Sequence, residues 1–131
     1  MNKFRAWDKV EKEWLNIRTI GFDDDGSLWY LQAWDDNEND IDPPYLEDDL
    51  GVKWELLQST GLKDRNGIEM FEGDVVKTKY GEHGRHIGIV TFRYGKFLSI
   101  GVKQYEGYVE ELDCMFEIIG NQFEHPNLLE E

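Results

Sequence analysis

Two turn signals close together in the middle of the chain constrain its fold more than any other feature. Residues 56–76 read LLQSTGLKDRNGIEMFEGDVV. The pair Asn66-Gly67 tolerates the positive φ that a tight turn requires, and Gly73 allows a second reversal just before a β-branched Val-Val pair. Because extended chain on either side of such a turn pairs antiparallel, the stretch predicts two consecutive hairpins. Turn geometry alone explains these residue types, so they indicate no chemistry.

The aromatic content also favours a β fold. The 131 residues include five Trp, six Tyr and seven Phe, and such side chains suit pleated, half-buried surfaces. Thirteen Gly against three Pro suit many short strands joined by turns. A chain of this length is most simply one domain. We expect one domain over residues 1–131, with subdomains at 1–60 and 61–131.

The first half predicts an antiparallel β-meander that ends in an acidic loop. Alternating side chains indicate strands at residues 3–8, 14–22 and 27–34. Residues 14–22 carry apolar side chains on both faces, which indicates a strand covered on both sides or bent by a bulge. Residues 35–50 form a loop by composition, because eight Asp and Glu repel one another there and Pro43-Pro44 blocks regular structure. We expect Tyr45, Leu46 and Leu50 to anchor its end, with one short helical turn.

The second half predicts a small barrel. Short runs of β-branched and aromatic residues are divided by turns that contain Gly. After a strand at residues 53–60, which ends the first half, we expect strands at 74–80, 86–94, 97–103 and 115–119, a short strand or helical turn within 105–113, and a helical turn at 125–129. This rhythm is typical of an SH3-like β-barrel. The expected fold class is mainly β: an N-terminal antiparallel β-meander and a C-terminal SH3-like β-barrel, with few short helical turns.

Three segments of the chain resemble the YopX family, small proteins carried by phages and prophages. TGLKDRNG at residues 60–67, followed by EMFEGDVV at 69–76, is similar to the central signature of that family. KFRAWD at residues 3–8 and EIIGNQFEHPNLL at 117–129 are similar to its terminal signatures, and the segments lie in the family's order. The resemblance implies a mostly β fold and a phage setting. It implies no known activity, so it assigns no catalytic residues to this chain.

The charge and the cysteine content restrict the setting. A net charge of −14 argues against general affinity for nucleic acid, and favours solubility and a basic protein partner. No apolar run approaches the roughly 18 residues of a membrane span, and the start of the sequence lacks a basic stretch followed by an apolar one, so we expect neither a membrane span nor a signal peptide. Cys114 has no second cysteine to pair with, which fits the cytoplasm of a host bacterium. We expect Cys114 to be a small buried side chain.

Motifs for catalysis, cofactors and metals are missing from the sequence. There is no G-x-S-x-G, Walker or G-x-G-x-x-G pattern. The run from Asp35 to Asn39 matches only the start of an EF-hand loop, since Asp40 stands where that loop needs Gly. His83 and His86 are three residues apart, so on one strand they would point to opposite faces. We therefore expect no catalytic residue, no cofactor and no metal site, and an enzyme is only the third hypothesis.

The first functional hypothesis is a non-catalytic protein-binding or accessory module. Its partner, such as a host protein, would meet an acidic face that carries aromatic side chains. The candidate residues are Trp29, Tyr30, Trp34, Asp35, Asp36, Asp40 and Asp42. One specific version is an acidic decoy that occupies a basic site of the host protein. The alternative interpretation of the aromatics is a buried core, and the exposed strand edges of a β protein also allow homo-oligomers.

The alternative hypothesis is a nucleic-acid-binding barrel. Residues 74–103 have a positive net charge, with six basic and two acidic residues, although the chain as a whole is negative. The candidate contacts are Lys77, Lys79, Arg85, Arg93 and Lys96, interleaved with Tyr80, Phe92, Tyr94 and Phe97. Basic groups beside aromatics bind single strands by charge and stacking, and we expect Arg93 to lie across from Lys77 and Lys79. The competing interpretation is a solvated basic strand face with the aromatics in the core.

Overall fold

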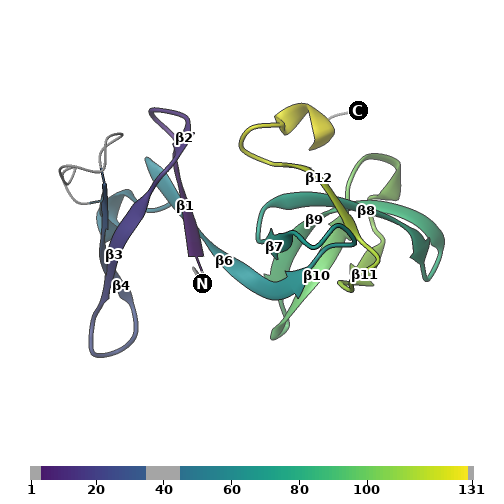
Figure 1. The fold of residues 1–131 in the computed structure, drawn as a ribbon, viewed down its shortest axis with the longest axis horizontal. Helices are drawn as coiled ribbons and strands as arrows, with labels where there is room; N and C mark the ends of the chain where they lie inside the picture. Colours follow the sequence, from purple (N-terminus) through teal and green to yellow (C-terminus); the bar gives the residue numbers. More distant parts are fainter. Residues whose placement is uncertain (1–3, 35–44, 130–131) are drawn as a thin grey trace. The chain divides into compact units, whose positions relative to one another are not determined.

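The computed structural model describes residues 4–34 and 45–129, without the side chains of Leu46 and Glu47. Within these ranges the regular structure consists of β-strands and three 3-10 turns (Figure 1). The prediction of a mainly β chain with few helical turns is confirmed. The chain forms two compact units: an N-terminal unit (Phe4–Leu56) and a C-terminal unit that begins at Leu57.

The N-terminal unit has two sets of antiparallel strands. β1 (Phe4–Asp8) pairs with β2 (Glu13–Trp14), while β3 (Ile17–Phe22), β4 (Leu28–Ala33) and β5 (Tyr45–Leu46) form a three-stranded sheet. The strand predicted at residues 14–22 is therefore divided between two sheets. The division falls between Leu15, whose N–H donates to the Ala6 carbonyl (2.9 Å), and Asn16, whose carbonyl accepts from the Trp34 N–H (2.9 Å).

Two bulges in the β3–β4 pair decide which side chains of the N-terminal unit are buried. The register shifts at Arg18 and at Trp29, so each is the extra residue in its strand. A bulge lets residues three apart point the same way, and Leu28 and Leu31 are both buried in a core with Trp54. The structure thus shows the bulge expected within residues 14–22. The bulge in β4 turns Trp29 outward, with 59% of its surface exposed.

The end of the acidic loop packs onto the N-terminal unit. β5 leads directly into the 3-10 turn η1 (Glu47–Asp49), and Tyr45 and Leu50 pack against the core. The Tyr45 hydroxyl donates a hydrogen bond to Asp8 Oδ2 (2.7 Å). The expected helical turn and the anchoring by Tyr45 and Leu50 are confirmed. The rest of the predicted loop, residues 35–44, lies outside the described residues.

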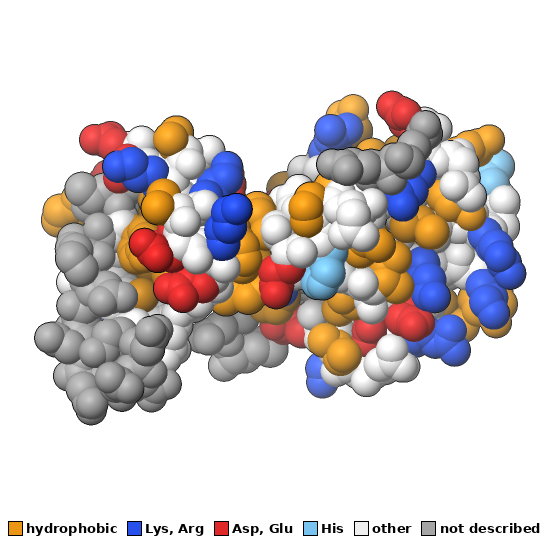
Figure 2. All heavy atoms as spheres, turned by 90° about the horizontal axis from the view of Figure 1, so that it is seen from above, with side chains coloured by type: hydrophobic (Ala, Val, Ile, Leu, Met, Phe, Trp, Pro, Cys, Tyr) orange, Lys and Arg blue, Asp and Glu red, His pale blue; other side chains and the backbone are white. Residues whose placement is uncertain are grey.

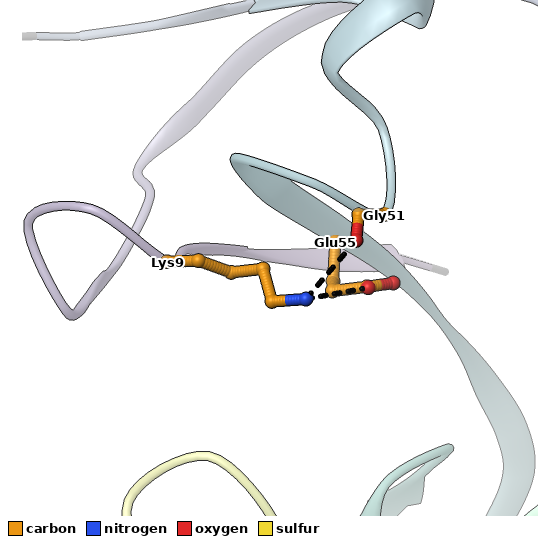
Figure 3. A network of polar contacts seen from close by, with 3 residues as sticks. All are labelled: Lys9, Gly51 and Glu55. Carbon is orange, nitrogen blue, oxygen red and sulfur yellow. Dashed lines mark hydrogen bonds and ion pairs between the residues drawn. The ribbon is translucent and has the colours of Figure 1, made fainter.

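The chain passes from the first unit into the second within β6 (Trp54–Lys63). Before this strand leaves the N-terminal unit, Lys9 holds it there: the ammonium group donates to the Gly51 carbonyl (3.1 Å) and to Glu55 Oε1 (3.3 Å) (Figure 3). β6 then pairs with β7 (Glu69–Phe71). The hairpin predicted from Asn66-Gly67 is confirmed, and Gly67 has the positive φ, 81°, that such a turn needs. The second hairpin, predicted at Gly73, is wrong: the chain does turn there, but the strands before and after Gly73 belong to different sheets.

Five strands form the sheet of the C-terminal unit: β8 (Asp74–Gly81), β9 (Gly84–Arg93), β10 (Lys96–Gly101), β11 (Val109–Glu111) and β12 (Glu117–Asn121). Their order is β11-β10-β9-β8-β12, and β8 and β9 curl strongly (Figure 1). The 3-10 turns η2 (Lys103–Tyr105) and η3 (Pro126–Leu129) follow β10 and β12. With β11 and β12 at its edges, the sheet is a curled half-barrel, and the SH3-like detail stays a prediction.

A buried carboxylate organises the turn beside the core of the C-terminal unit. The core consists of Met70, Val76, Val90 and Phe116. Asp64 Oδ1 accepts from the N–H groups of Asn66 and Ile68 (both 2.9 Å), and Oδ2 accepts from the Ile118 N–H (3.0 Å). One side chain therefore holds both the β6–β7 turn and β12.

Cys114 is exposed, so the expectation that it is buried is wrong. It lies in a turn that Asp113 closes: the Asp113 carboxylate accepts from the Met115 N–H (2.8 Å) and the Asp113 carbonyl accepts from the Phe116 N–H (3.4 Å). This turn buries Phe116 in the core and leaves Cys114 outside.

Candidate functional site

A cavity of about 430 Å³, here called the basic cavity, lies beside β8 and β9. Its cationic lining is Arg65, Lys77, Lys79 and Arg85. Lys77 and Lys79 are both exposed because alternate residues of β8 share a face, and Thr78 between them is buried. The Arg65 backbone N–H donates to the Phe116 carbonyl (2.8 Å), which ties the β6–β7 turn to the residue before β12.

Few acids compensate the charge of the basic cavity. Glu117 is the one acidic side chain among its described lining residues, and it lies opposite Lys77 in the β8–β12 register. No salt bridge joins Lys77, Lys79 or Arg85 to any residue that the structure describes. Figure 2 shows several Lys and Arg side chains close together on the C-terminal unit, at the right of the view. A chain with a net charge of −14 thus has a local positive region here.

A second, smaller cavity of about 240 Å³ adjoins the basic cavity, since both are lined by Arg85, His86 and Tyr105. The remaining lining of this smaller cavity is His83, Gln104, Tyr108 and Glu110. The turn between β8 and β9 supplies His83, the segment that begins with η2 supplies Gln104 and Tyr108, and β11 supplies Glu110. The smaller cavity is therefore aromatic and polar where the basic cavity is cationic.

His86 lies where the two cavities meet, and it is buried. Its Nε2 is 2.9 Å from Ser99 Oγ, and both groups lie over Gly88, where a Cβ atom would collide with them. Burial lowers the pKa of His86, and the negative charge of Glu110 and a hydrogen bond with Ser99 oppose this only in part. The ring is therefore neutral at pH 7, and the positive charge of the basic cavity comes from Lys and Arg.

The distance between His86 Nε2 and Ser99 Oγ is that expected between a general base and a nucleophile, but a substrate cannot reach the pair. Ser99 has no exposed surface, so a substrate carbonyl does not reach its Oγ. The pair instead joins β9 to β10 across Gly88.

The structure brings together three of the five basic residues predicted to contact nucleic acid: Lys77, Lys79 and Arg85. Arg93 and Lys96 lie opposite each other beside the β9–β10 turn, and Lys96 forms a salt bridge with Glu111 (2.7 Å). The expectation that Arg93 lies across from Lys77 and Lys79 is wrong, because the β8–β9 register places Ile87 opposite Lys77.

The aromatics that accompany the basic residues are mostly on the surface. Tyr80, Phe92 and Tyr94 expose 66%, 47% and 89% of their surface, while Phe97 packs against the core. The interpretation that these aromatics form the core is therefore wrong for three of the four. Arg65 is the cationic residue of the basic cavity that sequence reasoning missed. Its position within Asp-Arg-Asn-Gly indicates a turn, and the hydrogen bonds of that turn with Phe116 and Ile118 bring it to the cavity.

The structure describes only three of the seven residues predicted to bind a protein partner. Trp29 is exposed, and its ring meets Tyr30 edge-on (5.4 Å between centroids). Tyr30 and Trp34 are half-buried, and the Arg18 guanidinium lies 5.3 Å from the centre of the Trp34 ring. The four acidic candidates, Asp35, Asp36, Asp40 and Asp42, lie outside the described residues.

In the part of the chain that the structure describes, no helix has the length and apolar character needed to span a membrane.

Comparisons with known proteins identify the family. The sequence model of the YopX family, described as YopX protein, matches residues 3–130. Protein EF1440 from Enterococcus faecalis has a similar crystal structure, with 31% identity and a TM-score of 0.61 over 98% of this chain and 97% of that chain. The crystal structure of protein yopX from Bacillus subtilis is similar in fold, with 20% identity and a TM-score of 0.64 over 100% of this chain and 98% of that chain. No curated protein matches the chain. Because the family match covers nearly the whole sequence, the resemblance of the three signature segments is confirmed, and this chain belongs to the YopX family.

Proposed function

We propose that this chain is a non-catalytic accessory protein of a phage or prophage, acting in the cytoplasm of the host, that binds single-stranded nucleic acid through its C-terminal unit. The observation that carries the proposal is the basic cavity, where Lys77, Lys79 and Arg85 converge without a salt bridge to any described residue. The phage setting is part of this proposal, and the resemblance of the three signature segments supports it.

The net charge of −14 does not oppose local binding of this kind. At physiological ionic strength, charges separated by more than about 8 Å are largely screened. A phosphate in the basic cavity therefore responds mainly to the cations that line it and much less to acids elsewhere. Half-buried Tyr105, which lines the basic cavity, adds a ring on which a base can stack.

Fluorescence anisotropy with a labelled oligothymidylate of about ten nucleotides tests this proposal. We expect Lys77→Gln, Lys79→Gln and Arg85→Gln each to weaken binding by roughly threefold to tenfold at low salt, and to reduce the slope of log K against log salt by about 0.7 for each lost phosphate contact. Arg93→Gln is the matched control, because it removes the same charge outside the cavity. Equal losses in the control, or no binding by the unmodified protein, would refute the proposal.

Protein binding by the N-terminal unit is a second candidate, favoured by the exposed Trp29 beside Tyr30. In its decoy form, the acidic candidates occupy a basic site of a host protein, and exposed strand edges supply the alternative of self-association. Capture from host lysate, with and without nuclease, separates the two candidates. A captured protein that resists nuclease and is lost with Trp29→Ala, or with Asn at Asp35, Asp36, Asp40 and Asp42, supports the second candidate. Bound material that disappears after nuclease supports the first.

A further inference from the structure

The smaller cavity holds a buried acceptor that the fold uses only in part. The Glu110 side chain exposes 10% of its surface. Its Oε2 accepts from the Glu82 N–H at 3.1 Å, whereas the described contact of its Oε1 is His83 Nδ1 at 3.9 Å, which is too long for a hydrogen bond. An ionised carboxylate offers about four acceptor positions and no donor. Glu110 lines the smaller cavity, so a ligand that fits there and reaches the carboxylate would present N–H groups to it.

The rings that line this cavity suit a flat ligand. Tyr108 is 45% exposed, and the His83 ring lies against it with 5.2 Å between centroids. Tyr105 is half-buried beside His86. Aromatic side chains of this kind stack on nucleobases, which are flat and present their hydrogen-bonding groups at the edge. A volume of about 240 Å³ lies below the range of roughly 300–1,000 Å³ for whole ligands, so the cavity suits one part of a larger molecule.

Arg85 connects the two cavities, because it lines both. A nucleotide whose phosphate lies among the cations of the basic cavity would therefore have its base directed toward the smaller cavity. We propose that the smaller cavity binds one nucleobase of the strand and selects guanine through Glu110. Guanine presents two neighbouring donors, N1–H and N2–H, on its Watson–Crick edge, and these match the two oxygens of a carboxylate. Thymine presents one donor between two acceptor oxygens, and the negative carboxylate repels those oxygens. This proposal rests on the proposed function.

Anisotropy measurements with four oligothymidylates of about ten nucleotides test the proposal, one unmodified and three with a single guanine, adenine or cytosine. The guanine oligomer is expected to bind about tenfold more tightly than the unmodified one. Glu110→Gln should reduce that preference to about twofold and leave binding of the unmodified oligomer equal or slightly stronger, because Gln removes a negative charge but cannot accept both guanine donors. Glu111→Gln is the matched control, an exposed neighbour outside the cavity, and should keep the preference.

The outcomes separate the two proposals. If no oligomer binds, both fail. If all four bind equally, nucleic-acid binding stands and guanine selection is overturned. A preference that persists in Glu110→Gln also overturns it. Should Glu110→Gln fold poorly by circular dichroism, Tyr108→Ala replaces it. This change removes an exposed ring, so the fold is expected to tolerate it while the guanine preference falls.

Discussion

Replacing Asp64 tests how much one buried carboxylate contributes to the C-terminal unit. Asp64 is 4% exposed, and its carboxylate accepts three backbone N–H groups. Hydrogen bonds to charged groups contribute about 1.5–3 kcal/mol each. The N–H groups of Asn66 and Ile68 lie in an exposed turn, so water can replace their hydrogen bonds to Asp64. Water replaces the hydrogen bond of Ile118 in β12 less well. We therefore expect Asp64→Ala to lower the free energy of unfolding by about 3–4 kcal/mol, less than the full sum.

Asparagine at the same position separates charge from shape. Asp64→Asn keeps one acceptor oxygen but turns an amide N–H toward one of the bound N–H groups, so we expect a loss of roughly 1.5–2 kcal/mol. The assay is urea unfolding followed by far-UV circular dichroism, because all five Trp lie between residues 7 and 54 and their fluorescence reports on the N-terminal unit. Asp25→Asn, an exposed turn carboxylate that also accepts a backbone N–H, is the control and should change stability much less. A loss below about 1 kcal/mol in Asp64→Ala would refute the reasoning.

The pH dependence of the same group has a definite sign. Burial alone would raise the pKa of Asp64, but the N–H groups of Ile118, Ile68 and Asn66, together with the charge of Arg65, outweigh burial and lower the pKa below its ordinary value. A carboxyl with a lowered folded-state pKa stabilises the fold above its unfolded pKa, about 3.9. This stabilisation is lost as the pH falls from there through the folded pKa. Asp64→Ala should therefore show a weaker loss of stability in this acid range than the unmodified protein.

Three further changes probe the rest of the chain. Gly88→Ala should lower the free energy of unfolding by about 1–3 kcal/mol, measured by thermal unfolding, because its Cβ would collide with Ser99 Oγ. The pKa of His86 is lowered in the folded protein, so the unfolded chain takes up a proton at a higher pH than the folded chain, and stability should fall as the pH drops below about 6.5. The urea midpoint of His86→Gln should therefore decrease less over this pH range than that of the unmodified protein. Lys9→Met should cost less than about 1 kcal/mol by Trp fluorescence, because its salt bridge with Glu55 is partly exposed.

Much of the fold follows from local signals that short-range physics decides. Gly67 needs its positive φ whatever surrounds it, so the hairpin of β6 and β7 is predictable. The break between Leu15 and Asn16 is different, because it depends on hydrogen bonds to Ala6 in β1 and to Trp34, which follows β4. The prediction that Cys114 is buried is wrong for a similar reason. Its side chain is small and apolar, but the turn closed by Asp113 places Phe116 in the core instead.

The candidate site was predictable only where it is local. Lys77 and Lys79 share a strand face by the two-residue period of β8, which the sequence shows directly. The position of Arg93 depends on the register of two hairpins, and that register is set by turn lengths and bulges. The role that we propose for Glu110 could not be predicted, since its neighbours in the cavity come from the β8–β9 turn, from β9 and from the segment after β10.

Gly88 has a consequence for how sequences of this fold can diverge. The space that a side chain would need there is filled by His86 and Ser99, from two different strands, and by the Ile100 carbonyl. Ala at this position would collide with both side chains and with that carbonyl, so a homologue that acquires it loses stability unless the backbone of β10 also shifts. We therefore expect relatives that keep His86 and Ser99 to keep Gly88, and a relative with a larger residue there to differ at the other two positions as well. The residues at positions 86, 88 and 99 would then distinguish subgroups of the family, independently of what the cavities bind.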